Sequence, residues 1–218
     1  MKDKSILLVG GGGHCKSVLD TLVALRQYEK IGIVERKNNR KNEVLGIPVV
    51  GTDEELSSLL ASGYESAFIT VGSVGDPRQR IKLFNMIIKV GFSIPNIIDA
   101  TAIVSKNVKL DTGIFVAKGV IINAGARIES SCILNSGCII EHDCSIGAFS
   151  HIAPGAVLCG NVTIGDNTHI GANSVIRQGL KIGSNVIIGA GAVVINDVPD
   201  YCTAVGNPAT VTTATDPQ

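Results

Sequence analysis

Hydrophobic and polar positions follow two different rules along this chain, and the change falls near residue 100. In the first part, short apolar runs alternate with segments whose apolar residues are spaced for a helix. Residues 5–9 form an apolar run that stops at four consecutive glycines, and residues 16–26 then carry apolar side chains about one helical turn apart. This order predicts a strand, a tight turn and a helix.

The same alternation continues to residue 98. It predicts two more strands, at residues 31–34 and 66–71, and two more helices, at residues 53–61 and 76–90. Strands and helices that alternate at these lengths favour a parallel sheet with helices on its faces. We therefore predict a small Rossmann-like α/β domain over residues 1–98, with an exit linker at residues 95–100.

From residue 104 onward, the chain follows a strict period of six. Every sixth position is a branched aliphatic, without an insertion, at Val104, Leu110, Val116, Ile122, Ile128, Leu134, Ile140, Ile146, Ile152, Leu158, Ile164, Ile170, Ile176, Ile182, Ile188 and Val194. This period fits neither a helix nor simple alternating strands, and it is typical of a parallel β-helix built from hexapeptide repeats. The second domain is therefore predicted over residues 99–218.

A β-helix of this kind needs a cap at its end. No single repeat can bury its aliphatic side chain alone, so the stability of the domain comes from stacking, and the last coil exposes an unpaired surface. Residues 198–209 contain two prolines and leave the six-residue period. We predict that this segment caps the last coil.

Composition and charge remove several classes of function. Lys+Arg and Asp+Glu both number 19, so net charge gives no general attraction to nucleic acid or to an anionic membrane. Tryptophan is absent and aromatic residues make up 4%, which argues against a stacking surface for single-stranded nucleic acid. The first apolar run is too short for a signal peptide or a membrane span, so we expect a cytoplasmic protein without membrane insertion.

The six cysteines do not suggest disulfides or a zinc site. No CxxC pair occurs, and Cys132, Cys138 and Cys144 recur every six residues inside the apolar pattern. We interpret them as small buried thiols.

The chain resembles the sialic acid O-acetyltransferase and UDP-4-amino-sugar (bacillosamine) N-acetyltransferase family of hexapeptide-repeat acyltransferases. The resemblance rests on the glycine turn at residues 9–14, the Ile-Glu-His-Asp-Cys-Ser motif that opens residues 140–151, and the Val-Gly-Asn-Pro-Ala sequence at residues 205–209. It implies a left-handed β-helix with three hexapeptides per coil. It also implies a homotrimer with active sites between neighbouring subunits.

The resemblance places a general base at His142 and the acidic residue that orients it at Asp143. Acyl transfer from a thioester needs a group that takes a proton from the attacking amine or hydroxyl and then protonates the leaving thiolate. Histidine titrates near neutrality and serves both steps, and a carboxylate on its other ring nitrogen would fix its tautomer. The resemblance also assigns the backbone N–H of Gly160 to the oxyanion. By spacing alone, His142 would more often be a surface residue at a coil corner.

The resemblance implies acetyl-CoA as the co-substrate and no metal. It also assigns His151, Gly160 and backbone groups around Ala172 and Ala190 to contacts with this cofactor. His169 follows His151 by eighteen residues, which is one coil of three hexapeptides, so the two side chains should stack on the same face.

The resemblance assigns a nucleotide-linked sugar to the first domain, at Gly12, Gly13, His14, Glu35, Arg36 and Gly72. A glycine turn at a helix N-terminus offers free backbone N–H groups, which suit phosphates. Relatives commonly carry two aspartates where this chain has Glu35 and Arg36, so the identity of the sugar or nucleotide stays open. A second departure is Thr210, where the family usually has Lys or Arg, so we expect no phosphate contact there.

Other functions remain as alternatives. Gly10 and Gly12 before a helix, with Glu35 after the second strand, resemble a dinucleotide fingerprint, but Cys15 takes the third glycine position and the sheet has no second half. A zinc enzyme of carbonic-anhydrase type would need three closely placed histidines. The chain has four, at residues 14, 142, 151 and 169, and no closely spaced third ligand accompanies His151 and His169. A non-catalytic scaffold is the third alternative.

The leading hypothesis is N-acetylation of a nucleotide-linked amino sugar in cell-surface glycan synthesis. Its close variant is O-acetylation of a sugar such as sialic acid, because a His-Asp pair serves either nucleophile. The sequence does not decide between nitrogen and oxygen, or which acyl chain is transferred.

Overall fold

The computed structural model describes residues 4–39 and 42–214, which fall into two compact units. The first unit contains the residues up to 73 together with residues 78–97. The second contains residues 74–77 and everything from residue 98 onward. The two units are described separately below.

The first unit is built on a five-stranded sheet in the order β3-β4-β2-β1-β5. β1 (Ser5–Val9) pairs in parallel with β2 (Lys30–Val34) and with β5 (Ser66–Ile69), and it is buried along its whole length. A strand buried on both faces needs a continuous apolar run rather than alternation, which explains the first pattern in the sequence. β4 (Ile47–Gly51) extends the parallel sheet beyond β2, and β3 (Glu43–Val44) runs antiparallel at its edge.

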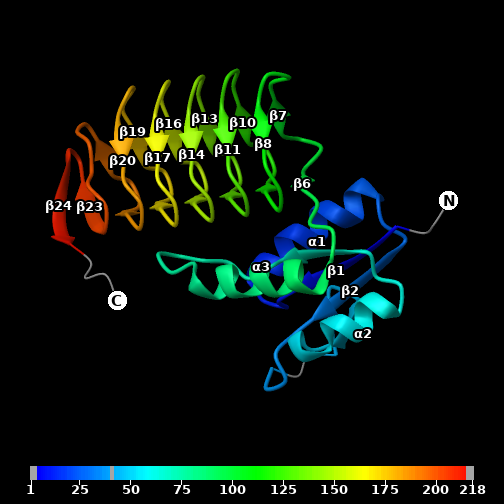
Figure 1. Cartoon of the computed structure of the whole chain (residues 1–218). Helices are drawn as coiled ribbons and strands as arrows, with labels where there is room; N and C mark the ends of the chain where they lie inside the picture. The colour runs from blue at the N-terminus through cyan, green and yellow to red at the C-terminus, as the bar shows by residue number, and fades with distance from the viewer. Residues whose placement is uncertain (1–3, 40–41, 215–218) are drawn as a thin grey trace. The chain divides into compact units, whose positions relative to one another are not determined.

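Three helices accompany this sheet (Figure 1). α1 (Gly13–Leu25) begins three residues before the predicted start, directly at the glycine turn. The predicted helix at residues 53–61 is a 3-10 turn, η1 (Asp53–Glu55), followed by α2 (Leu56–Ala61). α3 (Arg78–Val90) begins two residues later than predicted, because Asp76 precedes a proline and is disfavoured in the helical region.

The hairpin of β3 and β4 was not predicted. Its turn residues Leu45 and Gly46 both have positive φ, 50° and 78°, which is the backbone of a tight hairpin turn. One strand has only two residues, and the other contains Pro48, so neither gives a clear strand pattern.

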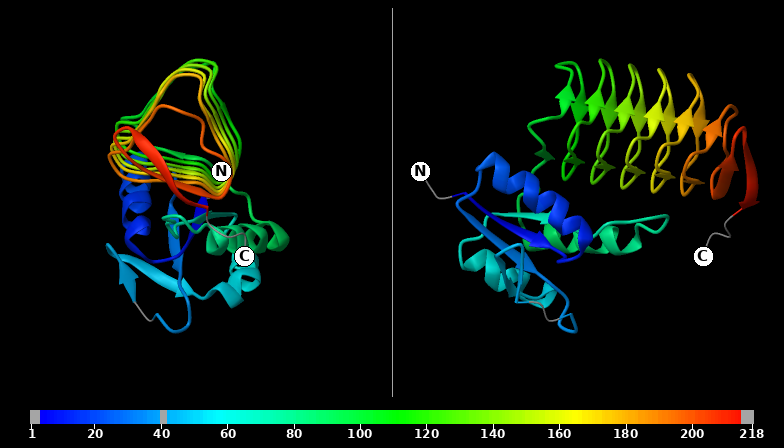
Figure 2. Two further views of the ribbon diagram at one scale, coloured as in Figure 1. Left: turned by 90° about the vertical axis from the view of Figure 1, so that its left-hand side faces the viewer. Right: turned by 180° about the vertical axis from the view of Figure 1, so that it is seen from behind.

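The second unit is the predicted parallel β-helix, whose stacked coils are visible edge-on in Figure 2. Its first sheet contains β7 (Ile103–Val104), β10 (Ile121–Ile122), β13 (Ile139–Ile140), β16 (Val157–Leu158), β19 (Val175–Ile176) and β22 (Val193–Val194). Its second sheet contains β8 (Lys109–Leu110), β11 (Arg127–Ile128), β14 (Ser145–Ile146), β17 (Thr163–Ile164) and β20 (Lys181–Ile182).

The third sheet includes the linker and the cap. It contains β6 (Ile97–Ile98), β9 (Phe115–Val116), β12 (Ile133–Leu134), β15 (His151–Ile152), β18 (His169–Ile170), β21 (Ile187–Ile188), β23 (Cys202–Gly206) and β24 (Ala209–Ala214). The predicted exit linker at residues 95–100 therefore contributes a short strand. The predicted cap is a hairpin, in which β23 pairs in parallel with β21 and antiparallel with β24, so it extends beyond residue 209.

The register explains the period of six. Each two-residue strand pairs with the strand eighteen residues later, as Ile140 does with Leu158, so one coil is three hexapeptides. The second residue of each strand points inward, and from Val116 onward all of these aliphatics are buried. The architecture is consistent with the left-handed β-helix that the resemblance implies.

The cysteines are free, and five of the six are buried. This confirms Cys132, Cys138 and Cys144 as buried thiols. None of the described helices is long and apolar enough to cross a membrane.

Candidate active site

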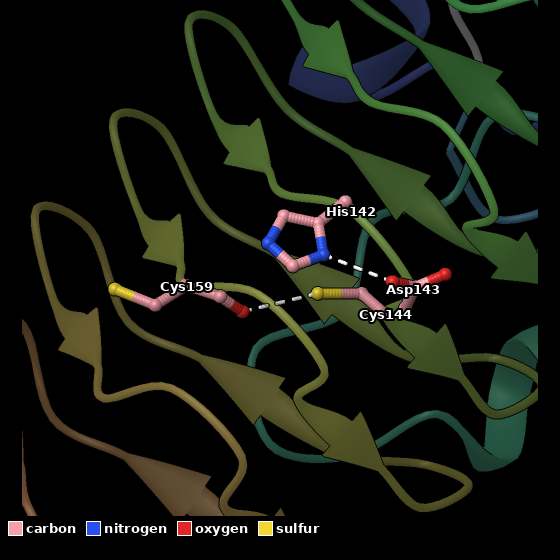
Figure 3. Close-up of polar contacts among 4 residues, drawn as sticks. All are labelled: His142, Asp143, Cys144 and Cys159. Carbon is pink, nitrogen blue, oxygen red and sulfur yellow. Dashed lines mark hydrogen bonds and ion pairs between the residues drawn. The ribbon is translucent and has the colours of Figure 1, made fainter.

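His142 and Asp143 form the corner between β13 and β14. Asp143 has a φ of 61°, in the left-handed region, and its Oδ2 lies 2.9 Å from Nδ1 of His142 (Figure 3). The two side chains are 56% and 65% exposed, so neither belongs to the core. Because the carboxylate engages Nδ1, Nε2 is the ring nitrogen that remains for proton transfer.

Glycines from the neighbouring coils flank this pair. Gly125 lies eighteen residues before Asp143, and a Cβ at Gly125 would overlap Oδ1 of the carboxylate. Gly160 lies eighteen residues after His142, and a Cβ there would overlap Nε2 of the imidazole. The predicted residues His142, Asp143 and Gly160 therefore lie together, with the glycine backbone against the free ring nitrogen.

The backbone N–H of Gly160 is available at this place. Among residues 4–39 and 42–214, it makes no hydrogen bond. An already oriented N–H beside a base is the arrangement that stabilises an oxyanion during acyl transfer.

His151 and His169 stack as their spacing predicts. They pair in register between β15 and β18, and their ring centroids lie 4.9 Å apart. His151 is only 9% exposed, and its Nε2 lies 3.2 Å from Nδ2 of Asn135. Oδ1 of Asn135 accepts from the N–H of Ser136, which orients the amide so that Nδ2 donates to His151. The proton of neutral His151 is therefore on Nδ1.

His169, the other member of the pair, is half-buried. Burial lowers the pKa of His169 below its ordinary value, which favours the neutral ring. This pair does not offer a second exposed base like His142.

The glycine turn is braced by Glu35. Oε2 of Glu35 accepts from the N–H of Gly11 at 2.9 Å, and Oε1 accepts from the N–H of Arg36 at 2.9 Å. Glu35 is 8% exposed. Its carboxylate holds the turn to the end of β2. The Arg36 side chain is exposed and lines an open cavity of about 380 Å³. The other residues that line this cavity are Glu35, Lys37, Asn39, Asn42, Val49, Val50, Gly51 and Thr52.

The N-terminus of α1 is open. Gly12 is its N-cap, without a side-chain cap, and the first turn has no acidic residue. Gly12 and Gly13 are exposed, and a Cβ at Gly72 would lie 3.4 Å from Cβ of His14. The predicted substrate residues of this loop are therefore neighbours, around backbone N–H groups that suit an anion.

The two alanines predicted to lie along the cofactor differ in their exposure. Ala190 is exposed, whereas Ala172 is half-buried and its carbonyl accepts from the N–H of Gly191 at 2.8 Å. In the part of the chain that the structure describes, no group of three or more His, Cys, Asp or Glu side chains is placed to hold a metal ion.

Sequence reasoning did not find three of the contacts in this part of the β-helix. Gly125 lies against the carboxylate of Asp143, Asn135 contacts His151, and Cys144 bonds to the carbonyl of Cys159. The coil length gives a signal for Gly125, because Asp143 follows it by one coil. The contact from Asn135 to His151 crosses between strands, and only the register reveals it.

Comparison with known proteins identifies both units. Residues 5–87 match the family described as PglD N-terminal domain, and residues 161–196 match bacterial transferase hexapeptide (six repeats). A comparison with curated protein sequences gives no match.

Solved structures resemble the whole chain. PerB from Caulobacter crescentus, in complex with CoA and GDP-perosamine, is 37% identical over 96% of this chain and 97% of that chain, with a TM-score of 0.89. The acetyltransferase domain of PglB from Neisseria gonorrhoeae, in complex with acetyl coenzyme A, is 34% identical over 96% and 100%, with a TM-score of 0.90. WeeI from Acinetobacter baumannii is 25% identical over 96% and 100%, with a TM-score of 0.84.

Proposed function

Because this chain belongs to the family of hexapeptide-repeat sugar acetyltransferases with a PglD N-terminal domain, we propose that it transfers the acetyl group of acetyl-CoA to a nucleotide-linked amino sugar. The chain is an acyltransferase. The observation that carries the proposal is the corner at which Asp143 holds Nδ1 of His142 and the backbone of Gly160 lies against Nε2. The relative PerB was solved with CoA and GDP-perosamine together, which supports a nucleotide-linked acceptor.

The geometry supports direct transfer. Nε2 of His142 takes a proton from the amino group as its nitrogen attacks the thioester carbonyl. The negative charge on the carbonyl oxygen is stabilised by the N–H of Gly160, and Asp143 stabilises the imidazolium. The C–S bond then breaks, and His142 returns the proton to the sulfur. The products are the N-acetylated sugar and CoA with a free thiol.

The first unit supports binding of the nucleotide. The open N-terminus of α1 presents the backbone of Gly12 and Gly13, which suits a diphosphate. Arg36, exposed at the end of β2, adds a positive charge beside the cavity there. Anion recognition by this unit favours a nucleotide-linked sugar over a free sugar as the acceptor.

The surface of the β-helix supports a homotrimer. In the sheet from β7 to β22, the outward position of every strand is an apolar β-branched residue: Ile103, Ile121, Ile139, Val157, Val175 and Val193. All six are partly or fully exposed. The corresponding positions of the sheet from β8 to β20 are Lys109, Arg127, Ser145, Thr163 and Lys181. An apolar sheet face of this kind favours burial against another copy of the chain.

The proposal also includes a location in the cytoplasm.

A substrate screen tests the proposal. Purified protein with acetyl-CoA is offered UDP-, GDP- and dTDP-linked 4-amino sugars, the free amino sugars, and sialic acid, and thiol release is followed with mass spectrometry of the products. We expect thiol release with a nucleotide-linked amino sugar and a product that carries one added acetyl group. Acetylation of sialic acid alone, or of none of these compounds, would contradict it.

A further inference from the structure

We propose that Cys144 is a positioning residue, whose thiol fixes the peptide between Cys159 and Gly160. This proposal rests on the proposed function, in which the N–H of that peptide stabilises the oxyanion. Cys144 follows the His142–Asp143 pair, but its side chain points inward and is only 1% exposed. Its part in the reaction would therefore be indirect.

The contact joins the core to the active site. Sγ of Cys144 donates to the carbonyl oxygen of Cys159 at 3.2 Å (Figure 3). That carbonyl and the N–H of Gly160 belong to one planar peptide, so a bond that holds the oxygen end also sets the direction of the N–H end. Burial raises the pKa of the Cys144 thiol, which keeps it protonated and able to donate.

Similar hydrogen bonds, from an inward side chain to a backbone carbonyl, occur elsewhere in the β-helix. They lie at corners that take no part in the proposed reaction. Three inward donors reach the carbonyl fifteen residues ahead: Cys132 to Gly147 at 3.1 Å, Ser150 to Gly165 at 2.8 Å, and Thr168 to Gly183 at 2.7 Å. In each of these corners the N–H of the same peptide is also bonded, from Ala148 to Asp166, from Asp166 to Ser184, and from Ser184 to Asp200. Both ends of these peptides are held by protein.

In the peptide between Cys159 and Gly160, by contrast, the protein holds only the carbonyl of Cys159. The N–H of Gly160 makes no hydrogen bond within residues 4–39 and 42–214. The inward residues that stack with Cys144 in the other coils are Val108, Ala126, Val162 and Leu180, which carry no donor. A donor thus appears in this column only at the coil whose acceptor belongs to the peptide beside His142.

Two substitutions separate the hydrogen bond from the volume of the side chain. Cys144→Val removes the donor and keeps an apolar residue of a kind that the column already accepts at Val108 and Val162. Cys144→Ser restores a donor. We expect kcat to fall about 3- to 10-fold in Cys144→Val, the size of one ordinary hydrogen bond, with the KM for acetyl-CoA unchanged. Cys144→Ser should recover most of kcat.

Cys132 supplies the matched control. Its bond to Gly147 has the same donor, the same fifteen-residue spacing and nearly the same length, but it serves a corner where both peptide ends are held. Cys132→Val should therefore lower the melting temperature much as Cys144→Val does, and leave kcat unchanged. An equal loss of kcat in both valine variants would overturn the proposal, because the effect would then be one of stability.

A spectroscopic measurement reads the same peptide without any substrate. Cys159-Gly160 is the only Cys-Gly sequence in the chain, so labelling cysteine carbonyls with ¹³C and glycine nitrogens with ¹⁵N gives one carbonyl–amide cross-peak. This peak should move in Cys144→Val, lie closer to its wild-type position in Cys144→Ser, and stay in place in Cys132→Val. A peak that Cys144→Val leaves unmoved would overturn the proposal. The readout does not need turnover, so failure of the sugar assignment would be distinguishable from failure of the Cys144 contact.

Discussion

The His142–Asp143 pair is shaped by residues that are distant in sequence and one coil away in space. Gly125 provides the surface on which the Asp143 carboxylate lies, and a Cβ there would overlap Oδ1. Because the overlap is with the end of a flexible side chain, the carboxylate would turn away rather than the fold break. The absence of a side chain at residue 125 therefore keeps Oδ2 on Nδ1 of His142.

Substitution of Gly125 tests this contact. Gly125 has a φ of 80°, so Gly125→Asn is the better choice, since asparagine tolerates the left-handed region and occupies it here at Asn161 and Asn167. We expect kcat to fall roughly tenfold, a part of the general-base contribution, with a normal circular dichroism spectrum. Gly137→Asn is the control, because Gly137 has a φ of 67° and nothing within 4 Å of a Cβ. Equal kinetics in the two variants would exclude a role for the contact with Asp143.

At the scale of elements, the stacked strands β15 and β18 hold two histidines in a partly buried site. Burial lowers the pKa of His169, so the folded chain binds a proton there less readily than the unfolded chain does. The stability that this provides is present above the unfolded-state value of about 6.5 and is lost as pH falls through the lower folded-state pKa.

The histidine pair therefore predicts acid sensitivity. The free energy of unfolding of the wild type should decrease between about pH 7.5 and pH 5, and His169→Gln should reduce that decrease. Urea denaturation at the two pH values measures it. His14→Gln, in the other unit, controls for the general loss of a titratable group. An unchanged pH dependence in His169→Gln would show that this ring does not couple folding to protons.

The elements also show where sequence reasoning ends. The period of six predicted every coil, because each aliphatic such as Ile140 must point inward for the stack to exclude water. The hairpin of β3 and β4 was missed, because two residues and a proline carry no periodic signal. The resemblance supplied His142 and Gly160, but the role of Cys144 needs the register between coils, since its acceptor lies fifteen residues ahead.

At the scale of the whole molecule, the proposed trimer depends on the apolar outward face of the sheet from β7 to β22. Val157→Glu places a charge in the middle of that face, and we expect it to dissociate the trimer, because an unpaired charge is costly to bury. Thr163→Glu, on the polar sheet, should leave the assembly intact. Sedimentation velocity measures both variants. A wild-type chain that sediments as a stable monomer with full activity would contradict a site shared between copies.

The most direct test of the account is the turnover of His142→Ala. Because His142 is an exposed corner residue outside the aliphatic columns, the variant should fold like the wild type and keep its affinity for acetyl-CoA. It should lose about 10²- to 10⁴-fold in kcat, the range for removal of a positioned general base. If His142→Ala instead retains near wild-type turnover while His151→Ala or His14→Ala abolishes it, the central assignment is wrong.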